Sequence, residues 1–316
     1  MMMHIKLTRP LYLLVTILLI GSCDQKPDDT YGEVVIVDDV NDTDDNGNAD
    51  ETPDVSSFTG YNQPVEDVNG WELIFEDEFT ANLDNWTIWT GGAYNNELQH
   101  YQPDNLILKE GVLFIREQRE SVTGATTNVD STQKNFNFTS GRIESNQNFS
   151  AGNTSNATKL RFSARILLPE GEGLWPAFWS YGDPWPTQGE FDILEFRGNN
   201  TTSYVTNFFY GTTAGVPSTD AGQTSFNVNL TSNITQNWHV FELIWSENTL
   251  EILFDNEVVH SFTEANWNVI NDMYTKSQRL VLNMAVGGDF FQPNVDPTSI
   301  PNEAFTAIDW VRVYKQ

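Results

Sequence analysis

The sequence predicts an all-β fold, an antiparallel β-sandwich of the jelly-roll (concanavalin A-like) type. Three observations lead to this prediction. Short stretches alternate apolar and polar residues, which is typical of half-buried strands. Gly, Asn and Pro separate these stretches, and no amphipathic pattern is long enough for a helix of three turns. Roughly a dozen such strands in one domain fit a sandwich, and the lack of an internal repeat argues against a propeller or solenoid.

Seven alternating stretches are the clearest strands in chain order. The segment Phe254-Asp255-Asn256-Glu257-Val258 predicts a tight hairpin, because Asp and Asn accept the left-handed backbone of a two-residue turn. The predicted strands cover residues 72–79, 112–119, 160–168, 239–245, 250–254, 279–286 and 307–314.

Composition narrows the class of partner. The 316 residues include 44 acidic and 16 basic side chains, for a net charge of -28, which argues against a nucleic-acid partner. A neutral polymer fits this charge more easily than a sulfated one. Aromatic residues make up 13% of the chain, and all ten Trp lie at or after Trp71, which suggests rings that stack on sugars. One cysteine and four scattered histidines argue against disulfides and a zinc site.

Residues 1–23 have the pattern of a secretory signal peptide. Lys6 and Arg9 precede an apolar run over 11–20, and about ten apolar residues are too few to span a bilayer. The ending Ile20-Gly21-Ser22-Cys23 resembles a bacterial lipobox, in which Cys23 is lipidated and becomes the mature N-terminus. The alternative is an ordinary signal peptide in which the cysteine has no role.

Residues 24–69 are acidic and polar, with Lys26 as the single base. Low hydrophobicity and high charge predict a disordered, solvated linker. Acidic residues soon after the lipidated cysteine resemble the export signal of bacterial surface lipoproteins. We therefore expect the protein on the outer membrane, exposed to the outside and held by its lipid alone. Residues 70–316 remain for the folded domain.

The segment from Glu190 to Glu195 carries the strongest chemical signal. Residues two apart on a strand share a face, so Glu190 and Asp192 point the same way, whereas Glu195 would face backwards. A β-bulge at Ile193-Leu194 returns Glu195 to the acidic face. Three crowded carboxylates raise one another's pKa. Retaining glycoside hydrolysis needs such a pair, a nucleophile and a protonated acid about 5 Å apart. A solvated acidic edge or part of a calcium site is the alternative.

The same acidic segment resembles the ExDxxE signature of glycoside hydrolase family 16. Flanking segments resemble the laminarinase-like branch, and they follow the family order over residues 70–316. They are Phe75-Glu76-Asp77-Glu78-Phe79, Asn95-Asn96-Glu97-Leu98-Gln99, Ser140-Gly141-Arg142, Gly173-Leu174-Trp175-Pro176-Ala177-Phe178-Trp179 and Asp309-Trp310-Val311-Arg312-Val313-Tyr314.

The resemblance implies a jelly roll with an open cleft across its concave sheet. It also implies endo-acting hydrolysis, with retention, of β-1,3- or β-1,4-linked glucans or galactans. By motif position, Glu190 is the nucleophile and Glu195 the acid/base, while Asp192 tunes the proton affinities of both. No cofactor is expected for catalysis. The expected partner is a neutral β-linked polysaccharide, and the expected state is a monomer.

Further residues are assigned by the same resemblance. Trp175 and Trp179 match aromatics that line the cleft, and Trp185 is expected to be a third sugar platform. Asn96 and Arg142 match positions that bind sugar hydroxyls. The alternatives are core packing for a Trp and a buried salt bridge for Arg142. Glu97 is expected to close a polar network rather than to touch substrate.

A structural calcium is implied on the convex face. The ligands would be Glu78, the carbonyl of Gly111, and Asp309, because oxygen donors suit this hard cation. The alternative is that these carboxylates are simply exposed.

Two departures from the family pattern bear on specificity. Laminarinase-like members usually carry a His on the strand after the catalytic one, where Asn207 is the nearest polar residue here. Ser180 and Tyr181 follow Trp179 where Met-Leu is more frequent. These differences leave the expectation of hydrolysis unchanged, but they leave the polymer open between β-1,3-glucan, mixed β-1,3/1,4-glucan and agar-type galactan, with transglycosylation a further alternative. A third possible function is that of a non-catalytic surface glycan-binding protein, but the three carboxylates argue against it.

Overall fold

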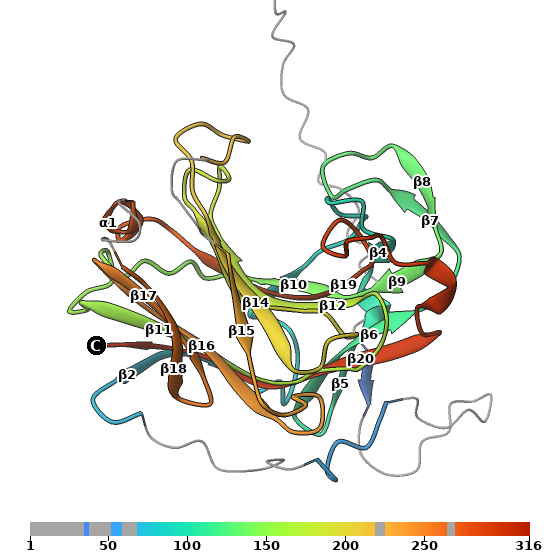
Figure 1. Cartoon of the computed structure of the whole chain (residues 1–316), viewed down its shortest axis with the longest axis horizontal. Coiled ribbons are helices and arrows are strands. Elements are labelled where there is room, and N and C mark those ends of the chain that lie inside the picture. Colours follow the sequence, from blue (N-terminus) through green and yellow to red (C-terminus); the bar gives the residue numbers. More distant parts are fainter. Residues whose placement is uncertain (1–34, 38–51, 59–67, 219–224, 264–268) are drawn as a thin grey trace, which may run out of the picture. The chain divides into compact units, whose positions relative to one another are not determined.

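The computed structural model describes residues 35–37, 52–58, 68–218, 225–263 and 269–316, all within one compact unit. A sheet of eleven strands and a sheet of seven strands stack face to face, and their pairings are mostly antiparallel (Figure 1). The predicted all-β sandwich is therefore confirmed. Within the described residues, α-helix is limited to the four residues of α1 (Ile270–Met273).

The larger sheet runs in the order β1-β5-β6-β20-β11-β16-β17-β18, with β2, β4 and β9 attached at its sides. Its strands are β1 (Val35–Val37), β2 (Glu72–Asp77), β4 (Gln99–Tyr101), β5 (Leu106–Lys109), β6 (Val112–Gln118), β9 (Phe138–Ser140), β11 (Lys159–Leu167), β16 (His239–Ser246), β17 (Thr249–Phe254), β18 (Glu257–Thr263) and β20 (Glu303–Lys315).

The seven-stranded sheet runs in the order β15-β14-β13-β12-β19-β10-β3. Its strands are β3 (Trp86–Ile88), β10 (Arg142–Ser145), β12 (Leu174–Tyr181), β13 (Glu190–Phe196), β14 (Ser203–Phe209), β15 (Phe226–Asn229) and β19 (Arg279–Val286). The remaining elements are the hairpin β7 (Val122–Ala125) with β8 (Gln133–Phe136), and the 3-10 turns η1 (Pro103–Asn105) and η2 (Pro297–Ser299).

Each of the seven predicted stretches overlaps a strand, with ends that differ by a few residues. The predicted hairpin joins β17 to β18, and its Asp255 and Asn256 have φ of 50° and 67°. Both lie in the left-handed region that such a turn requires. The sequence signal at this hairpin was therefore reliable.

The core lies between the two sheets and is rich in aromatic rings. Phe162 of β11 and Phe191 of β13 both contact Trp245 of β16, at centroid separations of 6.2 and 5.2 Å. Phe178 of β12 is also fully buried. Large buried rings contribute strongly to stability because each removes much apolar surface from water. This core fixes which face of the seven-stranded sheet remains open.

The linker prediction for residues 24–69 needs correction in two places. β1 pairs in parallel with β5, adding an edge strand to the larger sheet. Val55 is buried and packs with Ile107, Phe114 and other apolar residues. An open sheet edge can pair with any nearby β-branched segment, which overrides the polar composition around it. These two pieces lie on the domain rather than in a solvated tether.

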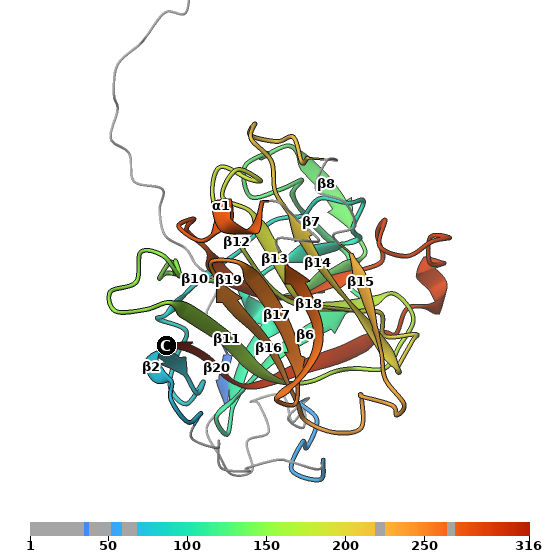
Figure 2. The same ribbon diagram turned by 60° about the vertical axis from the view of Figure 1, so that its left-hand side comes forward.

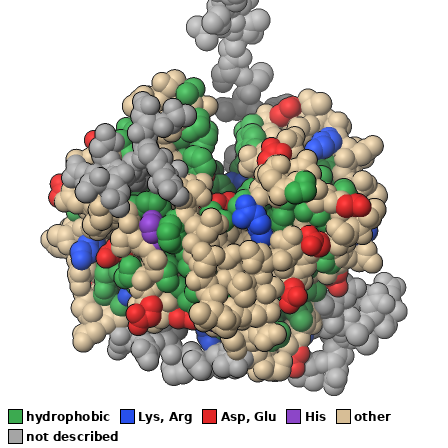
Figure 3. All heavy atoms as spheres, viewed as in Figure 1, with side chains coloured by type: hydrophobic (Ala, Val, Ile, Leu, Met, Phe, Trp, Pro, Cys, Tyr) green, Lys and Arg blue, Asp and Glu red, His purple; other side chains and the backbone are tan. Residues whose placement is uncertain are grey.

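The open face of the seven-stranded sheet holds the functional residues described below. Figures 1 and 2 show this sheet lying against the larger one, with loops and the β7–β8 hairpin rising around it. Figure 3 shows the resulting hollow between two raised rims, with hydrophobic side chains on both sides. The sandwich thus presents a long concave surface.

Candidate active site

β13 carries one extra residue at the position where the sequence predicts it. The residues of β12 that pair with Leu194 and Asp192 are consecutive, so Ile193 is unmatched. The register with β14 shifts at the same place, between Asp192 and Glu195. The predicted β-bulge at 193–194 is therefore confirmed.

The bulge separates apolar from acidic residues. The core face of β13 is apolar, and its residues are all buried: Phe191, Ile193, Leu194 and Phe196. The opposite, cleft face carries the three predicted carboxylates, Glu190, Asp192 and Glu195. Two consecutive core residues at 193 and 194 are possible only because the bulge interrupts the alternation. Without it, Glu195 would point into the core.

Burial raises the pKa of all three carboxyls, and repulsion from neighbouring carboxylates adds to it. Burial, and then the charge of Glu195, raise the pKa of Glu190 to about 8. Burial, followed by both neighbours, raises the pKa of Asp192 well above its ordinary value. Burial raises the pKa of Glu195 to about 7 against the lowering effect of Arg197. The group therefore holds protons near neutral pH, as a general acid must.

The two glutamates have similar pKa values, so proton affinity alone does not separate nucleophile from acid. The three sites titrate together, and a proton on Asp192 removes a negative charge from beside both glutamates. That loss of charge makes both glutamates easier to ionise, and a pKa of about 8 for Glu190 and about 7 for Glu195 does not by itself leave Glu195 as the protonated one. The roles of nucleophile and acid therefore stay predictions that rest on motif order.

Two indole N–H groups flank the acidic group. Trp185 lowers the pKa of Glu190, and Trp175 lowers that of Glu195. Both indole nitrogens are buried and lack a hydrogen-bond partner of ordinary geometry among the described residues. Trp175 is only 8% exposed and its ring stacks on Phe290, which matches the core-packing alternative, so its role as a sugar platform stays a prediction. Trp185 is half-buried, so part of its ring remains open to the cleft.

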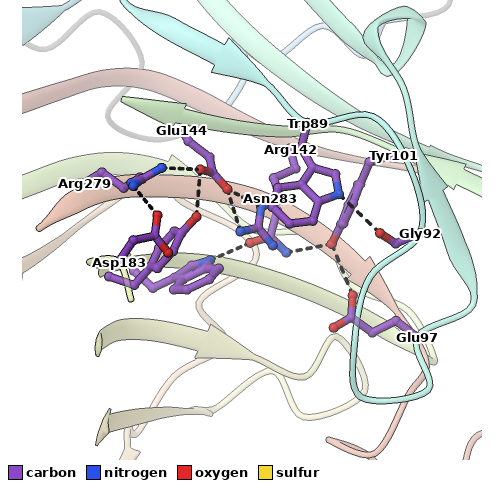
Figure 4. A network of polar contacts seen from close by, with 11 residues as sticks. Trp89, Gly92, Glu97, Tyr101, Arg142, Glu144, Asp183, Arg279 and Asn283 are labelled. Carbon is purple, nitrogen blue, oxygen red and sulfur yellow. Dashed lines mark hydrogen bonds and ion pairs between the residues drawn. The ribbon is translucent and has the colours of Figure 1, made fainter. Parts of the chain in front are cut away.

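A polar network beside the acidic group is centred on Glu144 of β10 (Figure 4). Arg142 donates to Glu144 Oε1 from Nε and Nη2, at 3.1 and 2.6 Å. Tyr181 donates its hydroxyl to Oε2 at 3.0 Å, and Arg279 Nη1 lies 3.5 Å from the same oxygen. Arg279 also pairs with Asp183. Arg142 is thus held in the buried salt bridge that was its alternative reading, and its sugar contact stays a prediction.

Trp179 anchors a second chain of hydrogen bonds across the cleft floor. Its Nε1 donates to Asn283 Oδ1 at 2.7 Å, and Asn283 donates to the hydroxyl of Tyr101 at 3.0 Å. Tyr101 in turn donates to Glu97 Oε2 at 3.4 Å, so Glu97 closes a network as expected. The Trp179 ring stacks on Tyr181 with centroids 5.3 Å apart and is half-buried. A fixed ring at this position remains suitable as a sugar platform.

The two predicted asparagines occupy different parts of the cleft. Asn96 is exposed, and its amide donates to both oxygens of Asp289 at 2.9 and 3.1 Å. Asn207 pairs with Asp192 in the β13–β14 register, so the strands place it beside the acidic group. Its Oδ1 accepts from the backbone N–H of Phe208 at 2.8 Å. Asn207 therefore lies beside the acidic group, whereas Asn96 lies in the loop before β4.

The three residues assigned to calcium lie close together, but two of them have other partners. A side chain added at Gly111 would come within 3.6 Å of the Glu78 carbonyl oxygen, and Asp309 contributes to raising the pKa of Glu78. Arg312 pairs with Glu78 at 2.6 Å, and Arg165 pairs with Asp309 at 2.5 Å. Within the described ranges, no group of three or more His, Cys, Asp or Glu could hold a metal. The carboxylates thus fit a metal less well than expected, and the carbonyls remain suitable donors.

Cys23 and the signal peptide lie outside the described residues. In the part of the chain that the structure covers, no helix has the length and apolar character needed to cross a membrane.

Several site residues were missed from sequence. Glu144 and Arg279 lie in strands with ordinary alternation, so nothing marked them. Tyr181 was noted as a departure from the family pattern, and the structure now gives it a partner. Arg197 follows the acidic motif by two residues, and Phe290 comes from a distant loop. Only the fold brings these two together.

A protonated carboxyl beside an ionisable one, at the floor of a hollow lined by aromatic side chains, suits cleavage of a glycosidic bond. The fold and the site together define a glycoside hydrolase.

Comparison with known proteins gives the same class. Residues 109–311 match the family described as Glycosyl hydrolases family 16. The chain is similar to glucan endo-1,3-β-glucosidase of Cryptopygus antarcticus, at 32% identity over 241 residues, which cover 70% of this chain and 82% of that one. It is 30% identical to β-glucanase of Rhodothermus marinus, with 78% and 85% covered. The solved endo-β-1,3-glucanase of Pyrococcus furiosus superposes with a TM-score of 0.64, at 28% identity and with 78% and 94% covered. The chain belongs to glycosyl hydrolase family 16, as the motifs indicated.

Proposed function

We propose that the protein is an endo-acting β-glucanase that cleaves β-1,3- or mixed β-1,3/1,4-linked glucan by double displacement, with retention. The bulge that sets Glu195 on the same face as Glu190 carries this proposal. The relatives named as endo-1,3-β-glucanases support the choice of polymer.

The proposed chemistry assigns one role to each carboxyl. Glu195 donates its proton to the glycosidic oxygen while Glu190 attacks the anomeric carbon, giving a covalent glycosyl-enzyme and a shortened polymer. Glu195, now ionised, then takes a proton from water, and the water oxygen displaces Glu190. Asp192 holds or releases a proton so that Glu190 can be ionised during attack.

Replacing the nucleophile gives a direct test. Glu190→Ala should lower reducing-sugar release from laminarin by at least about 1,000-fold, while binding to the same glucan survives. Glu117→Gln, in which a buried carboxyl outside the cleft is changed, is the matched control and should keep full activity. Proton NMR of the first products should show the β-anomer. An active Glu190→Ala enzyme or an α-anomer would overturn the mechanism.

The substrate can be separated from its alternatives by a panel of polymers. Laminarin and lichenan should be cleaved to short oligosaccharides, with agarose, carrageenan and xylan left intact. Asn207 and Tyr181 favour the second candidate, an agar-type galactan hydrolase or a transglycosylase, because both depart from the laminarinase pattern beside the acidic group. Cleavage of agarose, or products longer than the added oligosaccharide, would favour it. Glucan binding with no cleavage of any polymer would instead favour the non-catalytic binding protein.

The cellular location is a separate part of the proposal. A lipid on Cys23 would hold the enzyme on the bacterial outer membrane, facing outward, where a large polymer can reach it. Radiolabelled palmitate should enter the wild type but not Cys23→Ala, and protease added to whole cells should degrade the wild type. The purified domain should elute as a monomer in size-exclusion chromatography.

A structural calcium is the last proposed feature. Glu78, Gly111 and Asp309 would hold the ion through carbonyl and carboxylate oxygens and would thereby join the two ends of the domain. Addition of EDTA should lower the melting temperature, and excess Ca²⁺ should restore it. Asp309→Ala should remove the response to both, whereas an EDTA-insensitive wild type would exclude the site.

A further inference from the structure

The ring of Trp175 is held from behind by a loop residue. Its ring stacks on Phe290 with centroids 4.3 Å apart and planes 18° apart. Ala285 and Phe291 complete the contacts, and Trp175 is 8% exposed. Such close parallel stacking allows the indole little freedom to rotate.

Arg197 in turn holds Phe290 at two points. Its guanidinium carbon lies 3.5 Å from the centre of the Phe290 ring. Its Nε and Nη2 donate to the Phe290 carbonyl oxygen at 3.0 and 2.8 Å. The planar fork of arginine thus fixes the ring and the backbone of one residue together, which lysine cannot do.

The indole N–H of Trp175 is the group through which this arrangement reaches Glu195. It is buried, it has no partner of ordinary hydrogen-bond geometry among the described residues, and it lies near enough to Glu195 to lower the pKa of that carboxyl. A buried donor without a partner needs an explanation. A donor facing a carboxyl stabilises its ionised form, which is the form left after Glu195 gives up its proton.

We propose that Arg197 is a positioning residue for the acid/base, acting through Phe290 to keep the Trp175 indole N–H facing Glu195. This inference rests on the proposed function, because it takes Glu195 to be the group that protonates the leaving oxygen. Arg197 lies two residues after Glu195 in the chain, so one strand end supplies both the acid and its support.

Charge gives Arg197 a second, separable effect. Arg197 and Trp175 lower the pKa of Glu195, and Glu97 raises it. Loss of the cation should therefore raise the pKa of the acid and move the basic limb of the kcat/KM profile to higher pH. Loss of the stacking alone should lower kcat and move that limb in the same direction by a smaller amount, because the Trp175 N–H lowers the pKa of Glu195 less than the Arg197 charge does.

Four variants separate these effects. Arg197→Gln removes charge and fork, Arg197→Lys keeps the charge, and Phe290→Leu keeps the charge but removes the stack. Arg119→Gln is the matched control. Arg119 also covers a phenylalanine ring, at 4.6 Å from Phe138, and donates to two loop carbonyls, but away from the acidic group.

The pH–rate profiles are measured on laminarin and on 2,4-dinitrophenyl β-laminaribioside. The dinitrophenolate of the second substrate leaves without being protonated, so its release needs no acid. For Arg197→Gln we expect the basic limb to rise by about 0.5 pH unit. We expect kcat on laminarin to fall about tenfold, and kcat/KM on the aryl glycoside, which reports the glycosylation step alone, to fall less than about twofold. Arg197→Lys should restore most of the limb shift but only part of kcat, and Phe290→Leu should lower kcat while moving the limb less than Arg197→Gln does.

Melting temperatures of all four variants establish that each is folded. Equal losses on both substrates, or a profile for Arg197→Gln that matches Arg119→Gln, would overturn the inference. A wild-type enzyme that cleaves no β-glucan would instead overturn the proposed function.

Discussion

Glu242 on the larger sheet and the three carboxylates of β13 on the seven-stranded sheet have opposite surroundings. On the larger sheet, Glu242 accepts hydrogen bonds from Arg161 Nε at 2.8 Å and Nη2 at 2.6 Å, and from the hydroxyl of Ser163 at 2.5 Å. On the seven-stranded sheet, the three carboxylates of β13 form no ion pair with any residue that the structure describes. The same chemical group forms a close ion pair in one place and forms none in the other.

The difference shows how a sandwich separates structural from chemical carboxylates. A buried carboxylate with a bidentate arginine stays ionised and has no proton to give. A buried carboxylate without one must take up a proton instead. Glu144 shows that position in the fold is not the deciding factor, because it lies on the seven-stranded sheet and is still paired with Arg142. The counter-ion decides.

Glu195→Gln gives the largest effect that this comparison predicts. Glutamine keeps the shape of the protonated acid but cannot donate a carboxyl proton, so kcat on laminarin should fall by about 1,000-fold. Turnover of an activated aryl glycoside should fall much less in the first, glycosylation step. Stopped-flow measurement of the phenolate burst checks this. An equal loss in that burst would show that Glu195 is not the acid.

Arg161→Met tests the paired carboxylate. Glu242 would then be buried without its counter-ion, and the free energy of unfolding should fall by about 3 kcal/mol. Activity per folded molecule at 25 °C should not change. Urea titration measures the loss, and the double variant Arg161→Met/Glu242→Leu should recover most of it. A reduced kcat in the folded single variant would contradict a purely structural role for the Arg161–Glu242 pair.

Glu117 tests whether a missing counter-ion alone marks catalysis. It lies on β6, is fully buried, and has two oxygens without hydrogen-bond partners; burial raises its pKa to about 8. A raised pKa stabilises the fold below the ordinary value of 4.5, and this stability is lost as pH rises through the folded value. Glu117→Gln should therefore stabilise the protein at pH 9 by about 2 kcal/mol. Chemical denaturation at pH 5 and pH 9 checks this, and kcat should stay unchanged.

Glu190, one of the three carboxylates on the cleft face of β13, should change the stability with pH in the same direction as Glu117 but by a smaller amount. The pKa of Glu190 is about 8, against an ordinary 4.5, so its contribution to stability also declines between those pH values. Glu190→Gln should thus raise the free energy of unfolding at pH 8 by about 1 kcal/mol and leave it unchanged at pH 4. Glu242→Gln should destabilise at both. If Glu190→Gln were less stable than the wild type at pH 8, the Glu190 carboxylate would have to be stabilised by a partner in the folded protein.

The sequence predicted the architecture and the acidic motif well, because both depend on local patterns. Alternation marked the strands, and the Asp-Asn pair marked the β17–β18 hairpin. The bulge could be inferred because one extra residue must be inserted into the strand before Glu195 can share a face with Glu190. Composition misled at 35–37 and Val55, where contacts with the larger sheet outweigh the polar surroundings.

Side-chain environments could not be predicted in the same way. Trp175 matched a sugar-lining position, yet Phe290, which lies 115 positions later by its residue number (290 − 175), covers its ring. Arg142 matched a sugar-binding position, yet Glu144 holds it in an ion pair. Both outcomes depend on loops and neighbouring strands that lie close only in the folded chain.

The sequence by itself determined a β-sandwich with three acidic residues on one strand, because strand periodicity and a single bulge follow from adjacent residues. The tertiary structure decided which carboxylates have counter-ions and which indoles face them. A pKa depends on burial and on charges within a few ångströms, and these are set by residues far apart in the chain.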